Sequence, residues 1–328
     1  MLRRPLLAAA LALAASPLRA QQGGGGGGPS QPPLRLVVPF PAGGATDAVA
    51  RLFAPVLGAR LSQNVLVDNR PGAGGIPAAE AVVRAAPDGS TLLLATSSIH
   101  STAPAVNAAG LPFDPERDFA PLALLGVTPS LVLVSGTVPA TTLREFVAWA
   151  RARRGQVNYG SSGVGTTPHL NGALFDALAD TGMVHVPYRG TGPVYAELRR
   201  GDVHALLDVP ATAAPHIASG TVRALATTAP GETPLAPGVP TAAAAGLPGL
   251  VSETWFGLFG PAGLPPALAR RLTEAAVAAM SEPELRARFL AIGVEPRAEG
   301  GEALAARARE ERARWSELVR RLGIRVTD

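Results

Sequence analysis

The stretch LRLVVPFPAGGATDAVARLFAPVLGARL, residues 34–61, places a glycine pair between a short apolar run and a longer segment of helical character. The run LRLVV is rich in β-branched and long apolar side chains, which predicts a buried strand. From about Ala48 the sequence predicts a helix, with Thr46 or Asp47 as its N-cap. A strand, a glycine loop and a helix in this order indicate an α/β fold.

Strands and helices continue to alternate along the rest of the chain. Further strands are predicted in NVLVDNR, STLLLATSS, SLVLVSG, QVNYGSS, MVHVPYRG, VHALLDV and TVRALATTA. Helices are predicted between most of these strands, and three more close the chain, over about 265–280, 282–291 and 301–322. This order predicts two α/β lobes, each a mainly parallel sheet flanked by helices.

The last three helices have few strands of their own, so we expect them to pack on the first sheet. Lobe 1 would then comprise residues 34–126 and 230–328, and lobe 2 residues 127–229. The stretch from Pro230 to Pro248 is rich in proline, glycine and alanine, which is typical of a long crossing segment.

The first twenty residues have a basic start, an apolar run from Leu6 to Ala15 and a small residue at Ala20. This pattern predicts a secretory signal peptide over residues 1–20, and the apolar run is too short to span a membrane. Residues 21–33, QQGGGGGGPSQPP, predict a flexible linker. The chain has no cysteine, so we expect an exported protein with neither a disulfide nor a lipid anchor on cysteine.

Composition indicates a folded protein, because 47% of the residues are apolar and only 16% are charged. The chain has 29 basic and 25 acidic side chains, and every basic one is an arginine. Three of these arginines lie in the predicted signal peptide, so the exported part is close to neutral. Charge therefore gives no argument for nucleic-acid binding.

A second glycine loop, YGSSGVGTTPHL at residues 159–170, resembles PFPAGGATD at residues 39–47. Each loop follows a predicted strand and opens a predicted helix. Glycine lets the backbone approach a ligand closely, and the first N–H groups of a helix have no partner inside it. Each loop is therefore a candidate anion site, and one loop in each lobe could hold one ligand from both sides.

Nucleotide and hydrolase motifs do not fit these loops. A P-loop needs a lysine, and the spacing of Gly160, Gly163 and Gly165 is not that of a dinucleotide site. Ser161 and Ser162 lie near His169, and a second group of serines, Ser97 and Ser98, lies near His100. None of these serines is in a G-x-S-x-G motif, and Ser162 with His169 is the pair an exported hydrolase would use.

Three further side chains have more than one possible role. His169, in the first turn of its helix, can bind a ligand or brace the loop. Asp47 can cap its helix and fix the loop. Asp208 follows an apolar strand, at the edge where α/β sheets bind ligands. The five histidines lack metal-ligand spacing, so we predict no metal site.

Seven segments together resemble one protein family, the tripartite tricarboxylate transporter substrate-binding proteins, also called Bug receptors. They are LVVPFPAGGATDAVAR, NVLVDNRPGAGG, PFDPERDFAPLALLG, NYGSSGVGTTPHL, VHVPYRGTGPVYAELRRGDV, PHIASGTVRALA and ETWFGLFGPAGLPP. The similarity extends in one register from about Leu34 to the C-terminus.

The resemblance implies a two-lobed (type II) periplasmic binding protein with two crossovers and a cleft that closes on a small organic carboxylate. Such a ligand is a dicarboxylate or tricarboxylate, an acidic amino acid or an aromatic acid. The resemblance and the loop patterns together give the predicted ligand-binding residues: Phe40, Ala42, Gly43, Gly44, Asp47, Ser97, Ser98, Ser161, Gly163, Gly165, Thr166, Thr167, His169 and Asp208.

The same resemblance implies a location in the periplasm and delivery of the ligand to the subunits of an inner-membrane transporter. We expect a monomer that needs no cofactor, has no catalytic residue and is not an enzyme. Two alternatives stay open at the level of sequence: a ligand-sensing subunit for a membrane signalling kinase, and the exported serine hydrolase. The loop after Asp208 departs from the family pattern, because Pro210 comes one residue early, and this leaves the identity of the carboxylate open.

Overall fold

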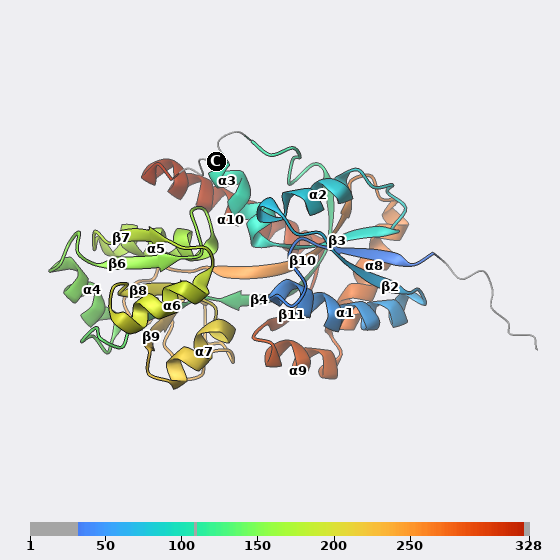
Figure 1. Ribbon diagram of the computed structural model, residues 1–328. Coiled ribbons are helices and arrows are strands. Elements are labelled where there is room, and N and C mark those ends of the chain that lie inside the picture. The colour runs from blue at the N-terminus through green and yellow to red at the C-terminus, as the bar shows by residue number, and fades with distance from the viewer. Residues whose placement is uncertain (1–31, 108–109, 325–328) are drawn as a thin grey trace, which may run out of the picture. The chain divides into compact units, whose positions relative to one another are not determined.

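A computed structural model describes residues 32–107 and 110–324 of the chain (Figure 1). The predicted signal peptide and nearly all of the predicted linker lie outside these residues. The strands are β1 (Leu34–Val38), β2 (Val65–Asn69), β3 (Thr91–Thr96), β4 (Phe119–Pro129), β5 (Leu131–Ser135), β6 (Asn158–Ser161), β7 (Val184–Pro187), β8 (Ala205–Asp208), β9 (Val222–Thr227), β10 (Glu253–Pro261) and β11 (Glu295–Gly300).

The helices alternate with these strands over most of the chain. They are α1 (Ala45–Leu61), α2 (Ile76–Val83), α3 (Ala103–Val106), α4 (Leu143–Arg151), α5 (Thr167–Ala179), α6 (Thr191–Arg200), α7 (Pro210–Ala218), α8 (Pro266–Met280), α9 (Pro283–Ala291) and α10 (Gly301–Leu322), with short helical turns η1 (Ala73–Gly75) and η2 (Ser98–Thr102). Within the described ranges, no helix is long and apolar enough to cross a membrane.

The strands form two sheets, which confirms the two-lobed α/β fold. One sheet has the order β11-β4-β10-β3-β1-β2, and the other has the order β7-β6-β8-β5-β9. The chain therefore passes between the sheets twice, from β4 to β5 and from β9 to β10. The predicted lobe boundaries are compatible with this division but stay predictions.

Both sheets are mixed, so the expectation of mainly parallel sheets was wrong. Among the strands that the structure describes, β1 pairs in parallel with β2 and β3, and β6 with β7 and β8, and no other strand pair is parallel. The other pairs are antiparallel because of the crossovers. Strand β4 leaves the first sheet and β10 returns to it, so these neighbours run in opposite directions, and the same holds for β5 and β9 in the second sheet.

Among the elements that the structure describes, the sequence pattern missed β4, β10, β11, α3 and α7, and also the short turns η1 and η2. Strands β4 and β10 are almost wholly buried, and a continuous apolar run without alternation gives no clear period. Strand β11, EPRAEG, is polar and forms the edge of its sheet. Helix α7 contains prolines at both Pro210 and Pro215, which disguise a helix in a sequence pattern.

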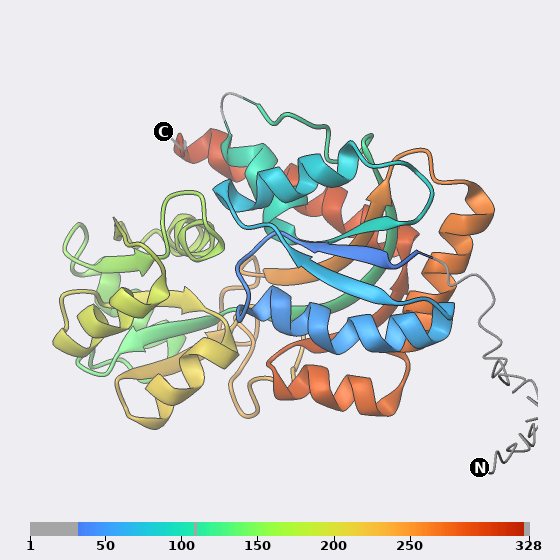
Figure 2. The same cartoon turned by 45° about the vertical axis from the view of Figure 1, so that its right-hand side comes forward.

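Each face of the six-stranded sheet is covered by helices. Leu34, Leu36 and Val38 of β1 pack with α1, α8 and α9, whereas Val37 faces α2 and α10. This period of two is the one expected for a strand buried on both faces. Figure 2 shows the sheet with α2 on one side and α1 and α9 on the other.

The five-stranded sheet is covered in the same way. Val132 and Val134 of β5 pack with α4 and α5, whereas Leu131 and Leu133 pack with α6 and α7. In α5, Gly172 lets the helix lie directly on the ring of Tyr159, because a Cβ there would stand 2.2 Å from Tyr159 Cε2. The start of α5, which carries the second glycine loop, is thus placed by close packing on β6.

Helix α10 connects the two cores. Its first half contributes Leu304 and Ala308 to the core beside the six-stranded sheet. Its second half contributes Trp315, Leu318 and Val319 to the core beside the five-stranded sheet. The C-terminal helix, expected to pack on the first sheet, therefore packs on both.

A buried carboxyl group lies in the middle of α10. Glu311 is 7% exposed and its Oε2 accepts a hydrogen bond of 2.8 Å from Nε1 of Trp255 on β10. Burial raises the pKa of Glu311 to about 7, although the hydrogen bond from Trp255 and the charges of Arg314 and Arg307 oppose the increase. Folding therefore favours the protonated carboxyl group.

The substitution Glu311→Gln should make folding stability less sensitive to pH. Protonated Glu311 stabilises the fold fully below its unfolded pKa, and this contribution is lost as the pH rises through about 7. The free energy of unfolding should be measured with urea at pH 5 and pH 8. From pH 5 to pH 8, the wild type should lose roughly 2 kcal/mol of unfolding free energy relative to the variant. The exposed neighbour Glu310, changed to Gln, is the control and should show no such gain. An equal difference between Glu311→Gln and wild type at both pH values would contradict the assignment.

Candidate functional site

The predicted ligand-binding loops lie at the carboxyl ends of the parallel strands in each sheet. In the first sheet these ends adjoin the crossovers, because Thr96 of β3 pairs with Phe256, close to the start of β10. In the second sheet Asp208 of β8 pairs with Leu131, the first residue of β5. Both loops therefore lie at edges next to the segments that join the lobes, where α/β proteins bind ligands.

The side chain of Asp47 fixes the first loop by a hydrogen bond to its backbone. Helix α1 begins at Ala45 with Gly44 as N-cap, so the prediction of Thr46 or Asp47 as N-cap was wrong. Asp47 is the third residue of the helix, and its Oδ2 accepts the N–H of Gly43 at 2.9 Å. Gly43 has a φ of +85°, a conformation that favours glycine, and this turn lets the helix begin earlier than predicted.

Two side chains support Asp47. Oδ2 accepts Nε of Arg51 at 2.9 Å, and Oδ1 accepts Nδ2 of Asn69 at 3.0 Å. Asn69 also donates to the carbonyl of Phe40 at 3.1 Å, so it ties the start of the loop to its end. Burial alone would raise the pKa of Asp47, but the hydrogen bonds from Arg51, Gly43 and Asn69 outweigh it and lower that pKa. The carboxylate is therefore ionised and acts as a fixed acceptor.

The second loop repeats this geometry with a different acceptor. Helix α5 begins at Thr167 with Thr166 as N-cap, and His169 is its third residue. Nδ1 of His169 accepts the N–H of Gly165 at 3.0 Å, and Gly165 has a φ of +78°. In both loops, a left-handed glycine just before the N-cap thus donates to the third helical side chain.

This shared arrangement decides which backbone donors are left for a ligand. The N–H groups of Gly43, Gly163 and Gly165 bond to Asp47, Ser161 and His169. These glycines therefore shape the loops rather than offer N–H groups. The amides that helix geometry leaves without an internal partner belong to Ala45, Thr46 and Asp47 in α1 and to Thr167 and His169 in α5, since Pro168 has no N–H.

Further hydrogen bonds to backbone groups fix the second loop. Thr166 Oγ1 donates to the carbonyl of Gly163 at 2.7 Å, and Ser161 Oγ accepts from Gly163 N–H at 3.1 Å. The carbonyl groups of Ser161 and Ser162 accept N–H groups of the segment after β7. The exposed face of this loop carries Val164, whose side chain is 43% exposed.

His169 is a brace for the loop, one of its two predicted roles. Burial lowers the pKa of His169, so the ring is neutral near pH 7 and Nδ1 is free to accept. Since Nδ1 accepts from Gly165, the ring hydrogen lies on Nε2, which remains a potential donor. Across the described residues, His169 makes no hydrogen bond to Ser162, the partner that the hydrolase alternative requires.

Ser97 and Ser98 follow β3 beside the first loop. A Cβ on Gly75 would lie 2.8 Å from both Pro39 Cβ and Ile99 Cδ1, so the ends of β1 and β3 and the turn η1 converge here. His100 does not join them, because it is fully buried and stacks on Phe259 with ring centroids 4.0 Å apart. Burial lowers its pKa to about 3. Proximity in sequence between Ser97, Ser98 and His100 therefore does not produce a catalytic pair.

Asp208 lies at the end of β8 and is 6% exposed. Its Oδ2 accepts the hydroxyl of Tyr195 at 3.0 Å and its Oδ1 accepts its neighbour's N–H, from Val209, at 2.9 Å. Burial raises the pKa of Asp208, while these bonds and one from Thr191 oppose the increase. The carboxyl group is thus held in place between β8 and the start of α6.

The sequence patterns did not identify Asn69, Arg51 or His185 as parts of the site. Asn69 ends β2, so its position as a polar residue at the carboxyl end of a predicted strand was a usable signal. Arg51 lies one turn after Asp47, and the i,i+4 spacing of opposite charges could have indicated the pair. His185, whose Nε2 shares a hydrogen bond with Oγ of Ser161, lies inside β7, where its spacing carries no signal.

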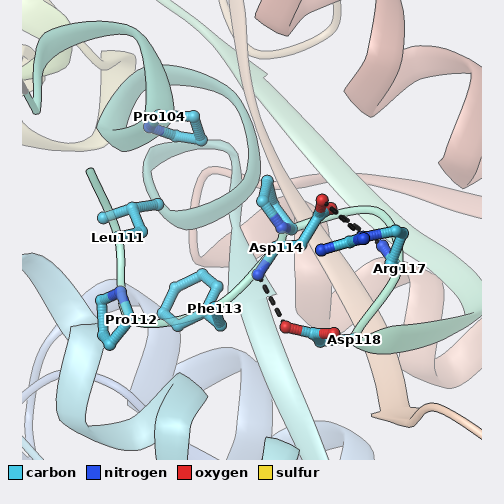
Figure 3. Close-up of a pocket in the computed structure, with 8 residues that line it drawn as sticks. Pro104, Leu111, Pro112, Phe113, Asp114, Arg117 and Asp118 are labelled. Carbon is cyan, nitrogen blue, oxygen red and sulfur yellow. Dashed lines mark hydrogen bonds and ion pairs between the residues drawn. The ribbon is translucent and has the colours of Figure 1, made fainter.

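A separate pocket of about 460 Å³ lies between α3 and the segment 111–118 (Figure 3). Its polar groups already bond one another: the carboxylate of Asp114 accepts Nε of Arg117 at 2.9 Å, and the carboxylate of Asp118 accepts the backbone N–H of Asp114 at 2.7 Å. None of the predicted ligand-binding residues lines it. This pocket is therefore distinct from the glycine loops.

The chain is similar to proteins of one family. The sequence profile of the family described as "Tripartite tricarboxylate transporter family receptor" (TctC) matches residues 49–324. A UPF0065 protein from the tcbD-tcbE intergenic region of Pseudomonas sp. strain P51 is 36% identical over 321 residues, which cover 97% of this chain and 93% of that protein.

Two solved structures from Rhodopseudomonas palustris have the same fold. MatC, with bound malate, is 34% identical with a TM-score of 0.73 and covers 88% of this chain and 98% of its own. Rpa4515, with adipate, is 32% identical with a TM-score of 0.77, and the match covers 89% of this chain and 98% of Rpa4515. The chain therefore belongs to the tripartite tricarboxylate transporter receptor family.

Proposed function

We propose that this protein is a periplasmic solute receptor that binds a small organic carboxylate between its two glycine loops. It would deliver that acid to the inner-membrane subunits of a tripartite tricarboxylate-type transporter. The observation that carries the proposal is the repeated loop geometry, in which Gly43 bonds to Asp47 and Gly165 bonds to His169. Each bond leaves a helix N-terminus with outward-facing amides.

In this proposal one carboxylate group accepts hydrogen bonds from both loops. The N–H groups of Ala45 and Thr46 act from lobe 1, and the N–H and hydroxyl groups of Thr167 act from lobe 2. The Nε2 hydrogen of His169 supplies a further donor. Helix N-termini favour anions without a paired arginine, because the positive end of the helix dipole adds to the oriented amides.

The remaining predicted residues would form the rest of the ligand site. Phe40 and Ala42 precede the first glycine pair, and Ser97 and Ser98 lie beside it at the end of β3. Asp208 would contact the distal end of the ligand. The relatives solved with malate and adipate contain dicarboxylates, which makes small acyclic dicarboxylates the first candidates.

No bond needs to be made or broken in this function. The imidazole of His169 is occupied by the loop at Nδ1, and it is neutral because burial lowers its pKa. Affinity would come from oriented donors and from closure of the two lobes around the acid.

A thermal-shift panel on the exported form tests the proposal. Malate, adipate, citrate, glutamate and benzoate are compared with glucose and with inorganic phosphate. A carboxylate at a hundred times its Kd should stabilise the protein by about 2.7 kcal/mol, seen as a higher Tm. A shift with glucose or phosphate and with none of the acids would contradict the proposal.

The variant Gly43→Ala should weaken carboxylate binding roughly tenfold, because a left-handed φ costs about 1–2 kcal/mol for a residue with a Cβ and the turn would relax. Gly155→Ala is the matched control, since Gly155 has a φ of +77° and a Cβ added there, as at Gly43, would meet no atom within 4 Å. Both variants should lose similar stability on urea unfolding, but only Gly43→Ala should lose affinity in calorimetric titration. Equal affinities for the two variants would show that the first loop does not hold the acid.

A further inference from the structure

His185 lies behind the second glycine loop, on the strand next to it. Strand β7 pairs in parallel with β6, and His185 is opposite Tyr159 in the register. Nε2 of His185 shares a hydrogen bond of 2.6 Å with Oγ of Ser161, the last residue of β6. The same Oγ accepts the N–H of Gly163 at 3.1 Å. A continuous chain of hydrogen bonds thus runs from His185 through Ser161 to Gly163.

The ring of His185 also contacts His169, whose Nδ1 holds Gly165 of the loop. It stacks on His169 with ring centroids 3.8 Å apart and an interplanar angle of 15°. The ring of His185 also stacks on that of Tyr159, with ring centroids 5.0 Å apart and an interplanar angle of 29°. Tyr159 is itself buried against Gly172 of α5. His185 therefore connects the packed core of lobe 2 to both side chains that shape the loop.

The charge state of the two imidazoles is compatible with this stack. Burial, with a smaller effect from His169, lowers the pKa of His185 to about 4, and burial lowers the pKa of His169. Both rings are neutral near pH 7, so stacking them at 3.8 Å brings no like charges together.

We propose that His185 is a positioning residue for the carboxylate site, which fixes Gly163 through Ser161 and fixes Gly165 through the ring of His169. This inference rests on the proposed function, because it assigns His185 no contact with the ligand. Its effect is to keep the amide and hydroxyl groups at the start of α5 aimed at one point. Removing a partner of a buried hydrogen-bonded group costs about 1–3 kcal/mol, which corresponds to a loss of roughly tenfold or more in affinity if the loop is released.

Three variants separate the two contacts of His185. His185→Ala removes both contacts, His185→Gln keeps a polar group that can reach Ser161, and His185→Phe keeps a ring on His169. With malate as the probe in calorimetric titration, His185→Ala should raise Kd roughly tenfold or more. His185→Gln should recover most of the affinity, and His185→Phe should recover less, because Ser161 then lacks its partner.

His204→Ala is the matched control. His204 is half-buried in the same lobe, but its Nδ1 accepts the N–H of Asn158 at 2.9 Å, at the start of β6 rather than at its carboxyl end. The variant His204→Ala should have a lower Tm than wild type but the same Kd for malate. A Kd for His185→Ala within twofold of wild type, or an equal loss of affinity in His204→Ala, would overturn the inference.

A measurement without ligand keeps this inference separate from the proposed function. Amide hydrogen exchange of Gly163 and Gly165, followed by NMR, should be faster in His185→Ala than in wild type and in His204→Ala, because the bonds of both amides would be weakened. If wild type does not bind malate, this exchange alone decides the role of His185. Unchanged exchange at both glycines would overturn it.

Discussion

The candidate site depends on one hydrogen bond made twice, from a left-handed glycine to the third side chain of the helix that follows. Asp47 accepts from Gly43, and His169 accepts from Gly165. A carboxylate and a neutral imidazole therefore perform the same task in the two lobes. Each bond fixes the angle at which the chain enters its helix, and so the direction of the first unpaired amides.

This constraint explains how an anion site can exist without a dedicated cation. Arg51, the arginine next to the first loop, donates to Asp47 and so supports the loop. Fixed amides lose little entropy when a carboxylate arrives, whereas a free arginine side chain would have to be ordered. The half-buried side chains of Asn69 in lobe 1 and His185 in lobe 2 maintain this arrangement from the neighbouring strands β2 and β7.

Much of the fold could be predicted from the sequence, because the parallel strands β1–β3 and β6–β8 coincide with clear apolar runs. These runs end in glycine or polar turns. Strands β4, β10 and β11 could not be predicted, since β4 and β10 are buried without alternation and β11 is polar. The loops themselves were identified, but the roles within them were not. Which N–H groups are free depends on side-chain acceptors such as His169 Nδ1, and proximity across strands, as between Ser161 and His185, has no counterpart in local spacing.

The central claim is that both loops bind the same carboxylate group through the amides at the starts of α1 and α5. An amide-resolved NMR titration with malate tests it most directly. We predict that the amide protons of Ala45, Thr46 and Thr167 shift downfield together, with one apparent Kd, as hydrogen bonds to the carboxylate form. Saturable binding of malate that leaves the amides of either helix start unshifted would contradict it.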